Sequence, residues 1–192
     1  DSGSYSQIAK MVDGYRKGNK NVILVDAGDI IQDNLIERFI NEPRHPAMLV
    51  LNQMGYDVMV PGNHEFNFGM PALDNVLKQF KGKVLAANIY YDNGANYLPA
   101  STIITKEGVK IGIIGVTTPL TEKFEENTGN AKGMKFTMPI PELRNQVNSL
   151  RGRVDAIVVV AHMGLPNENN IPGTGVIDIA NEVPGIDVII AG

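Results

Sequence analysis

The chain has 192 residues, of which 43% are hydrophobic and 20% are charged, and its formal net charge is −4. One ordinary globular domain is expected at this length and composition, and no apolar run is long enough to span a bilayer. The sequence pI near 5.4 argues against a nucleic-acid polymer as partner, because proteins that bind one usually present a basic face. Cysteine is absent, which excludes disulfides and thiolate metal ligands.

Apolar periodicity predicts alternating helices and strands in the first half of the chain. Apolar and aromatic residues at helical spacing predict a helix over 4–16, and an apolar run predicts a buried strand over 21–25. Further segments are expected in this order: helical at 35–40 and 46–54, strand at 56–60, helix at 70–80 and strand at 84–88. Pro46 suits the first turn of its helix, where its missing N–H removes no helical hydrogen bond.

The second half begins with a predicted hairpin, in which strands 100–105 and 109–116 flank the turn pair Glu107-Gly108. Helices are expected at 141–150 and 176–182, strands at 155–160 and 188–190, and long loops at 129–133 and 167–175. This alternation predicts an α/β fold with a largely parallel or mixed sheet. The apolar strands lack in–out alternation, which indicates that both faces of the sheet are covered.

Three of the predicted strands end in polar residues of the kinds that bind metal ions. Asp29 follows the first strand after Gly28, Asn63 and His64 follow the second, and His162 follows the strand at 155–160. Because α/β proteins place their chemistry at the carboxyl edge of the sheet, we expect these side chains on one rim. Carboxylate, amide oxygen and imidazole are the ligands of a hard-to-borderline metal site.

Each of these residues also has a structural interpretation. Asp29 taken alone would more often be a helix N-cap before Ile30, because caps are far commoner than metal sites. Asn63 and His64 could be a turn asparagine and a surface histidine, although their Pro-Gly-Asn-His-Glu context makes this the weaker interpretation. An isolated histidine such as His162 is usually a core residue whose hydrogen bonds are satisfied. Its interpretation as a metal ligand rests on the polar residues at the two other strand ends.

The remaining motifs carry less chemistry. Glu65 could bind a metal ion, orient His64 or cap the following segment, and orientation or a structural role is favoured. His45 is expected to be a loop or helix-start residue. The glycines of 108–115 do not have the G-x-G-x-x-G spacing of a dinucleotide loop. There is no G-x-S-x-G elbow and no cysteine, so hydrolysis through a covalent serine or cysteine has no support.

In these segments the chain resembles the calcineurin-like metallophosphoesterases, and within them the bacterial 5′-nucleotidase and 2′,3′-cyclic-nucleotide 2′-phosphodiesterase/3′-nucleotidase family. The matching segments follow the family's order over nearly the whole chain. They are Asp-Ala-Gly-Asp at 26–29, Gly-Asn-His-Glu-Phe-Asn-Phe-Gly at 62–69, Ala-Asn-Ile at 87–89, Gly-Val-Thr-Thr-Pro at 115–119 and Ala-His-Met-Gly at 161–164. The Gly-Asn-His-Glu match is highly specific.

The resemblance implies a four-layer α/β/β/α metallophosphoesterase sandwich with mixed sheets, formed as a single catalytic domain over 1–192. It implies two divalent metal ions (Mn, Zn or Fe) between the sheets, with Asp29 as the bridging ligand and Asn63 and His162 as ligands of the second ion. It implies His64 as the catalytic histidine, which stabilises the transition state. The implied reaction is hydrolysis of a nucleotide phosphoester by a metal-activated water, and an extracytoplasmic location is expected because the family is often exported.

Three family features are absent from this sequence, which is therefore expected to be a fragment of a longer enzyme. An Asp-x-His motif on an opening strand would precede Asp1, a Gly-His-x-His motif would begin at Gly192, and a C-terminal nucleotide-binding domain would follow. The isolated fragment is accordingly expected to be inactive or nearly so. The alternative is a phosphate- or nucleotide-binding domain without turnover. Asn67, where the 5′-nucleotidase branch usually has aspartate, favours a cyclic-nucleotide substrate.

Overall fold

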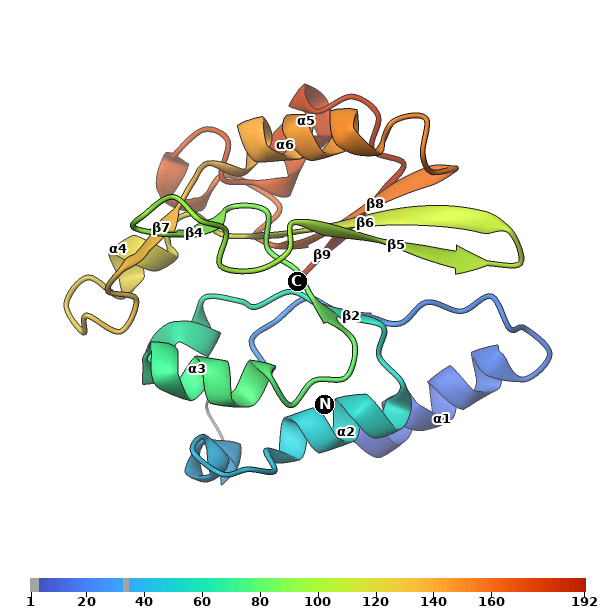
Figure 1. Cartoon of the computed structure of the whole chain (residues 1–192), viewed down its shortest axis with the longest axis horizontal. Helices are drawn as coiled ribbons and strands as arrows, with labels where there is room; N and C mark the ends of the chain where they lie inside the picture. The colour runs from blue at the N-terminus through green and yellow to red at the C-terminus, as the bar shows by residue number, and fades with distance from the viewer. Residues whose placement is uncertain (1–3, 33–34) are drawn as a thin grey trace.

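The structure is a computed structural model that describes residues 4–32 and 35–192 (Figure 1). Its α-helices are α1 (Tyr5–Arg16), α2 (Pro46–Met54), α3 (Met70–Leu77), α4 (Thr121–Phe124), α5 (Pro139–Leu150) and α6 (Val176–Glu182). Its 3₁₀ helices are η1 (Leu35–Phe39), η2 (His64–Phe68) and η3 (Glu168–Asn170). None of the helices within these ranges is both long and apolar enough to cross a membrane.

The strands form two principal sheets and one small pair. The first sheet is parallel and has the order β1 (Val25–Asp26), β2 (Val58–Met59), β3 (Lys83–Val84). The second is mixed and has the order β5 (Ser101–Lys106), β6 (Val109–Thr117), β8 (Ala156–His162), β9 (Val188–Ala191). The pair is antiparallel and joins β4 (Ile89–Tyr91) to β7 (Met134–Phe136).

The two principal sheets lie face to face, with α1, α2 and α3 outside the first sheet and α5 and α6 outside the second (Figure 1). This arrangement is the four-layer α/β/β/α sandwich that the family resemblance implied, with one parallel and one mixed principal sheet. The apolar layer between the sheets includes Val58, Val60 and Leu85 from the first half of the chain, and Ile113 and Val160 from the second. Their side chains are at most 1% exposed.

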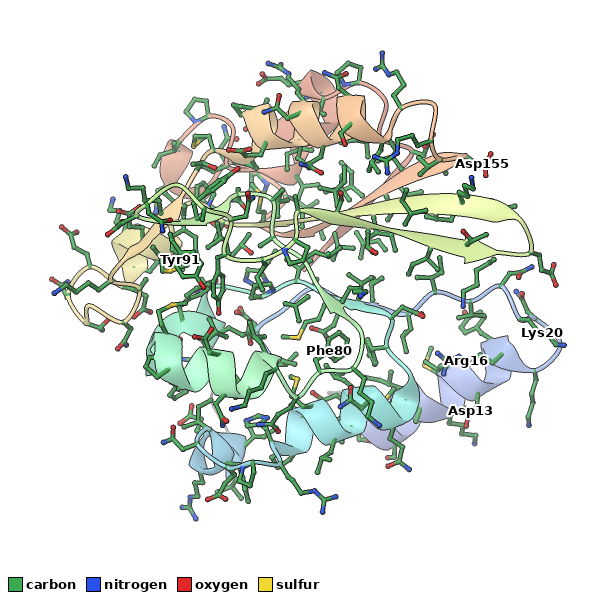
Figure 2. The ribbon with its side chains drawn as sticks, viewed as in Figure 1. Asp13, Arg16, Lys20, Phe80, Tyr91 and Asp155 are labelled. Carbon is green, nitrogen blue, oxygen red and sulfur yellow. The ribbon has the colours of Figure 1, made fainter. Side chains whose placement is uncertain are left out.

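A separate apolar layer fills the space between each sheet and its helices. Phe80 lies in the layer between the first sheet and its helices (Figure 2). Asp155, at the opposite end of β8 from His162, accepts a hydrogen bond from the backbone N–H of Lys110 (Figure 2). His162, at the other end of β8, is seven residues from Asp155, which corresponds to roughly 23 Å of extended chain.

The predicted hairpin is present, and its turn pair explains its geometry. Strands β5 and β6 pair antiparallel from Ser101 opposite Ile114 to Lys106 opposite Val109. Glu107 and Gly108 both have positive φ, at 48° and 88°. Two consecutive residues in the left-handed region are what a type I′ turn requires, and this turn matches the twist of the two strands.

The strand predicted over 21–25 is paired only at Val25 and Asp26. The carbonyl of Leu24 accepts the backbone N–H of Asp57 at 2.8 Å, but the N–H of Leu24 donates to a carboxylate oxygen of Asp57 at 2.9 Å, so a side chain replaces the strand acceptor there. The prediction of a buried strand over 21–25 was therefore wrong in its bounds and its burial: the strand is limited to Val25 and Asp26, and residues 21–25 are exposed or half-buried. The Asp57 side chain that contacts Leu24 lies 33 positions away and has no local sequence signal.

The strand predicted over 84–88 was wrong in its length, because the chain crosses between the sheets in this segment. The backbone N–H of Leu85 donates to the carbonyl of Met59 in the first sheet at 2.9 Å. Two residues later, the N–H of Ala87 donates to the carbonyl of Gly115 in the second sheet at 2.7 Å. A Cβ on Gly115 would lie 2.5 Å from the carbonyl oxygen of Leu85, so the crossing depends on glycine at this position.

Candidate functional site

The four predicted site residues lie at the carboxyl ends of three strands from both sheets. Asp29 follows β1, Asn63 and His64 follow β2, and His162 is the last residue of β8. Strands β1 and β2 are parallel neighbours, so their carboxyl ends lie together. The end of β8 meets them from the opposite sheet, as the contacts of His162 show.

The side chains of Asp29, Asn63 and His162 converge on one nitrogen atom. Nε2 of His162 lies 3.0 Å from Oδ1 of Asn63 and 3.2 Å from Oδ2 of Asp29. The side chain of His162 is 10% exposed and that of Asp29 is 33% exposed, so the imidazole is buried while the carboxylate also faces solvent. A carboxylate oxygen, an amide oxygen and an imidazole nitrogen therefore meet between the two sheets.

The ring of His162 is oriented by the carbonyl oxygen of Ala27, which accepts a hydrogen bond from Nδ1 at 2.7 Å. A carbonyl on one ring nitrogen, with the other nitrogen facing acidic or metal partners, is the usual setting of a metal-binding histidine. Burial alone would lower the pKa of His162, but the hydrogen bond and charge of Asp29 outweigh it and raise that pKa. Burial likewise acts to raise the pKa of Asp29, and the contact with His162 outweighs it and lowers that pKa.

Two glycines allow the loops that carry these residues to approach each other. Gly28 has φ 98°, and a Cβ there would lie 2.8 Å from the carbonyl oxygen of Val60. A Cβ on Gly62 would lie 2.7 Å from Cε1 of His162 and would also overlap the Asp29 carboxylate. Asp29 itself has φ 61°, a left-handed conformation that aspartate tolerates better than most residues.

Glu65 ties the two loops together through their backbone N–H groups. Its carboxylate accepts hydrogen bonds from the N–H of Gly62 at 2.5 Å, of Asp29 at 2.7 Å and of Ile30 at 2.7 Å. The side chain is 0% exposed, and burial raises the pKa of the Glu65 carboxyl. All three contacts go to backbone atoms, so Glu65 has the structural role that was one of the two expected for it.

Asp29 does not cap a helix at Ile30. Residues 30–32 lie outside any helix, and η1 begins at Leu35. Oδ1 of Asp29 instead accepts the backbone N–H of His64 at 3.0 Å. The carboxylate therefore links the loop after β1 to the loop after β2, and its second oxygen faces His162.

His64 is partly exposed, and its imidazole contacts Asn67 rather than the cluster around His162. Its Nδ1 lies 2.7 Å from Oδ1 of Asn67, three positions further along η2. Residues three apart eclipse each other in a 3₁₀ helix, which accounts for this local pairing. The amide nitrogen of Asn67 donates to Oε1 of Glu125 at 2.5 Å.

The donor set around His162 fits a divalent cation. Ligands about 2.0–2.2 Å from a common ion lie roughly 3 Å from each other, close to the separations found here. Among the described residues, no three His, Cys, Asp or Glu side chains form a group that could hold a metal ion, so the set of three exists only with Asn63 included. Asp29, Asn63 and His162 are the residues that could hold the ion.

Asn88 and Thr117 belong to two of the matched segments and anchor the loop beside Asn63. Thr117 N–H donates to Oδ1 of Asn88 at 3.0 Å, and Nδ2 of Asn88 donates to the Thr117 carbonyl at 2.7 Å. The Thr117 hydroxyl donates to the carbonyl of Pro61 at 2.6 Å. Both residues are 0% exposed, and this bonding explains why polar side chains occur there.

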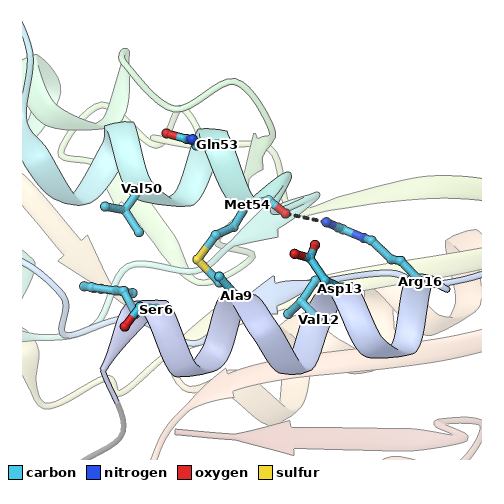
Figure 3. A pocket seen from close by; sticks show the side chains of 9 residues that line it. Ser6, Ala9, Val12, Asp13, Arg16, Val50, Gln53 and Met54 are labelled. Carbon is cyan, nitrogen blue, oxygen red and sulfur yellow. Dashed lines mark hydrogen bonds between the residues drawn. The ribbon is translucent and has the colours of Figure 1, made fainter.

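A pocket of ≈ 370 Å³ lies apart from this site, between α1 and α2 (Figure 3). Arg16 extends along it and donates from Nη1 to the carbonyl of Met54 at 2.5 Å. The lining residues come from α1 and α2 and include none of the four predicted site residues. The pocket is therefore separate from the predicted site and does not indicate a different location for it.

The sequence matches the family described as "Calcineurin-like phosphoesterase" over residues 1–192. It is 30% identical over 210 residues to the trifunctional nucleotide phosphoesterase protein YfkN of Bacillus subtilis, covering 97% of this chain. It is 31% identical over 196 residues to the NAD 5′-nucleotidase of Haemophilus influenzae, covering 100% of this chain. It is 32% identical over 203 residues to the 2′,3′-cyclic-nucleotide 2′-phosphodiesterase/3′-nucleotidase of Salmonella typhimurium, covering 96%.

The fold agrees with these sequence relationships. The crystal structure of the calcineurin-like phosphoesterase YfkN from Bacillus subtilis superposes with a TM-score of 0.82 at 28% identity, covering 96% of this chain and 61% of that one. The chain spans only part of the relatives' length: 14% of the Bacillus protein, 30% of the Haemophilus protein and 31% of the Salmonella protein.

Proposed function

The chain belongs to the calcineurin-like phosphoesterase family, and we propose that it is the catalytic domain of a metal-dependent enzyme that hydrolyses nucleotide phosphoesters. The observation that carries the proposal is the meeting of Asp29, Asn63 and His162 around one imidazole nitrogen at the ends of three strands. The relatives named as nucleotidases and nucleotide phosphodiesterases support the substrate class.

In this proposal, Asp29, Asn63 and His162 would hold divalent metal ions of the Mn, Zn or Fe type. When bound, two such ions neutralise phosphate charge and lower the pKa of the water that attacks phosphorus. The Ala27 carbonyl keeps Nδ1 of His162 protonated and directs Nε2 to the cation. Glu65 joins the loop that carries Asp29 to the loop that carries Asn63 and would keep these two donors close together.

His64 is proposed to act on the phosphoryl group and not as a metal ligand. Asn67 holds Nδ1, which leaves Nε2 to balance charge on the phosphoryl oxygens or to protonate the leaving alkoxide. The Asp29 carboxylate also accepts the backbone N–H of His64. His64 is therefore held by one contact to its backbone and one to its imidazole.

Three protein donors do not complete the coordination shells of two ions. The proposal therefore treats 1–192 as one part of a longer protein, whose other segments supply further ligands and a C-terminal nucleotide-binding domain. The share of the relatives' length that the chain spans agrees with this. An extracytoplasmic location remains part of the proposal through the family resemblance.

Cyclic nucleotides are the favoured substrates within this class, because Asn67 stands where the 5′-nucleotidase branch of the family usually has aspartate. The alternative is a domain that binds phosphate or nucleotide without turnover, which the small number of donors within the described residues favours. Activity of the longer protein that contains 1–192 should be assayed with excess Mn²⁺ on cyclic and 5′ nucleotides, with metal content measured by mass spectrometry. Hydrolysis with two bound ions is the expected result. Nucleotide binding without hydrolysis would establish the alternative.

A further inference from the structure

We propose that Glu125 is a positioning residue for His64: acting through Asn67, its carboxylate determines which ring nitrogen of His64 carries the proton. The inference rests on the proposed role of His64 in phosphoester hydrolysis. It concerns a residue 58 positions from Asn67 in sequence, at the C-cap of α4.

Glu125 is a buried carboxyl group surrounded by uncharged hydrogen-bond donors. It follows α4 as the C-cap residue and is 3% exposed. Oε1 accepts from Nδ2 of Asn67 at 2.5 Å. Oε2 accepts from the Thr128 hydroxyl at 2.5 Å and from Nδ2 of Asn130 at 3.2 Å. Both oxygens are therefore engaged, and the shortest contacts are those to Asn67 and Thr128.

The carboxylate fixes the orientation of the Asn67 amide. An ionised carboxylate can only accept hydrogen bonds, so the amide nitrogen of Asn67 must face Glu125. The reverse orientation would place two acceptor oxygens 2.5 Å apart. Since the nitrogen faces Glu125, the amide oxygen faces Nδ1 of His64 at 2.7 Å.

The orientation of the amide in turn fixes the tautomer of His64. The amide oxygen is an acceptor only, so Nδ1 of His64 must be the donor and must carry the hydrogen. In the neutral ring the lone pair then lies on Nε2, the atom proposed to act on the phosphoryl group or the leaving alkoxide. Without the carboxylate the two ends of the amide are nearly equivalent in shape, and rotation would present an N–H to Nδ1 instead.

The need for Glu125 follows from the amide at position 67. A carboxylate at that position would accept from Nδ1 in either orientation, because both of its oxygens are acceptors. An amide has one acceptor end and one donor end and requires a second group to select between them. Glu125 supplies that group, so Asn67 and Glu125 act as a pair.

Glu125 also contributes to the structure of η2, which a test must separate from its effect on the tautomer. Asn130, which donates to Glu125, also donates to the backbone carbonyl of Asn67 at 2.7 Å. A variant that merely loosened η2 would change stability and activity together. The tautomer of His64 is a readout that loosening alone would not convert to the opposite form.

The tautomer is measured by long-range ¹H–¹⁵N correlation spectra of the ¹⁵N-labelled 192-residue chain at alkaline pH. The chain has three histidines, and substitution of His45 and of His162 assigns the remaining signals to His64. We expect the Nδ1–H form in the unchanged chain. Glu125→Gln is expected to give a mixture with the Nε2–H form, and Glu126→Gln, which removes the same charge from an exposed neighbour, is expected to change nothing.

A paired substitution tests the logic of the contact. Asn67→Asp alone brings two carboxylates to hydrogen-bonding distance and is expected to be destabilised by like-charge repulsion. Asn67→Asp combined with Glu125→Gln exchanges carboxylate and amide, so the introduced glutamine donates to the introduced aspartate. This double variant is expected to regain the Nδ1–H form. It is also the variant to measure if Glu125→Gln alone does not fold.

The kinetic test uses the longer protein on a cyclic nucleotide. Glu125→Gln is expected to lower kcat by about 100-fold, the lower end of the contribution of a positioned acid or base, with little change in KM. The double variant is expected to recover most of that loss, and Glu126→Gln is expected to behave as the unchanged enzyme.

An unchanged His64 tautomer in folded Glu125→Gln would overturn the inference, whatever happens to the rate. The Nε2–H form in the double variant would overturn it equally. If the tautomers follow the expected pattern but the longer protein does not hydrolyse nucleotides, the proposed function fails while the positioning of His64 by Glu125 stands. The two proposals therefore fail on different measurements.

Discussion

Nε2 of His162 lies 3.0 Å from Oδ1 of Asn63, although the two residues are 99 positions apart and belong to opposite sheets of the sandwich. The contact joins the carboxyl end of β8 to the loop after β2. Asp29 approaches the same nitrogen from the end of β1, so residues from both sheets form one site. The site is consequently a product of the tertiary fold, and each change below alters either the chemistry of this junction or the contacts that hold it.

His64→Ala in the longer protein is expected to lower kcat by at least about 100-fold while metal content stays near that of the unchanged enzyme. The reason is that the imidazole contacts Asn67 and not the cluster around His162. Metal content is measured by mass spectrometry alongside turnover. His162→Ala is the matched control, and it is expected to lose metal and activity together. Loss of metal from His64→Ala would show that His64 is a ligand.

Glu65→Ala is expected to destabilise the chain by about 1–3 kcal/mol. It leaves the buried backbone N–H of Gly62 and the partly buried N–H groups of Asp29 and Ile30 without their acceptor, and an unsatisfied buried donor costs about 1–3 kcal/mol. Urea denaturation of the 192-residue chain gives the free energy of unfolding. Glu126→Ala, at an exposed position, is expected to change it by no more than about 0.5 kcal/mol. Similar values for the two variants would contradict the role of Glu65 in holding the loops.

Gly62→Ala is expected to disrupt the site, because the added Cβ would overlap the Asp29 carboxylate and lie 2.7 Å from the His162 ring. We expect lower thermal stability and a weaker affinity for Mn²⁺, measured by calorimetry. Gly14→Ala is the control: Gly14 lies inside α1, and its Cβ would meet nothing within 4 Å. Replacing a helix-interior glycine there is expected to stabilise by about 0.5–1 kcal/mol. An unimpaired Gly62→Ala would mean that the loops are less closely packed than described.

His45 is expected to make the chain less stable in mild acid. Its side chain is 0% exposed, neither ring nitrogen has a hydrogen-bond partner in the part of the chain that the structure describes, and burial lowers its pKa below the ordinary value of 6.5. As pH falls below 6.5, the unfolded chain takes up a proton that the folded chain does not, so the free energy of unfolding falls by up to about 1.4 kcal/mol per pH unit. The loss stops at the lowered pKa of the folded state.

The comparison for His45 is His45→Met, which keeps an apolar side chain and cannot take up the proton. The backbone contacts of residue 45, to the Gln79 side chain and to the N–H of Leu49, do not depend on the imidazole. The difference in unfolding free energy between the two proteins is expected to shrink, or to turn in favour of the variant, as pH falls from 7 to 5. A difference that does not vary with pH would refute the assignment.

Sequence patterns were sufficient to predict the bounds of helices whose ends are determined by neighbouring residues. The helices at 46–54 and 176–182 were predicted with the bounds that the structure has. The meeting of Asp29 and Asn63 also followed from sequence, because the carboxyl ends of the parallel strands β1 and β2 lie at one edge of their sheet. His162 joins them from the opposite sheet, which the shared edge of one sheet did not predict. The chemical roles of these residues, and of His64, stay predictions.

The elements that sequence reasoning missed depend on long-range contacts. The pairing of β4 with β7 joins short segments about 45 positions apart. Residues 134–138 alternate apolar and polar residues, a strand signal that the prediction did not use, whereas β4 has no such alternation. Glu125 reaches Asn67 across 58 positions and resembles any glutamate in a polar turn. Helix α3 ends at Leu77 and not at residue 80, because the last residues bond three positions back in a tighter turn.

The crossing at 85–88 makes the two sheets one cooperative unit. Neighbouring amides in this segment report on different sheets: Leu85 N–H is bonded to Met59, and Ala87 N–H is bonded to Gly115. Neither sheet can separate from the other without breaking one of these bonds and exposing the apolar layer between them. Slow hydrogen exchange of both amides should therefore show the same dependence on denaturant, that of global unfolding. The closure of the site, which requires both sheets, would then persist for as long as the domain itself stays folded.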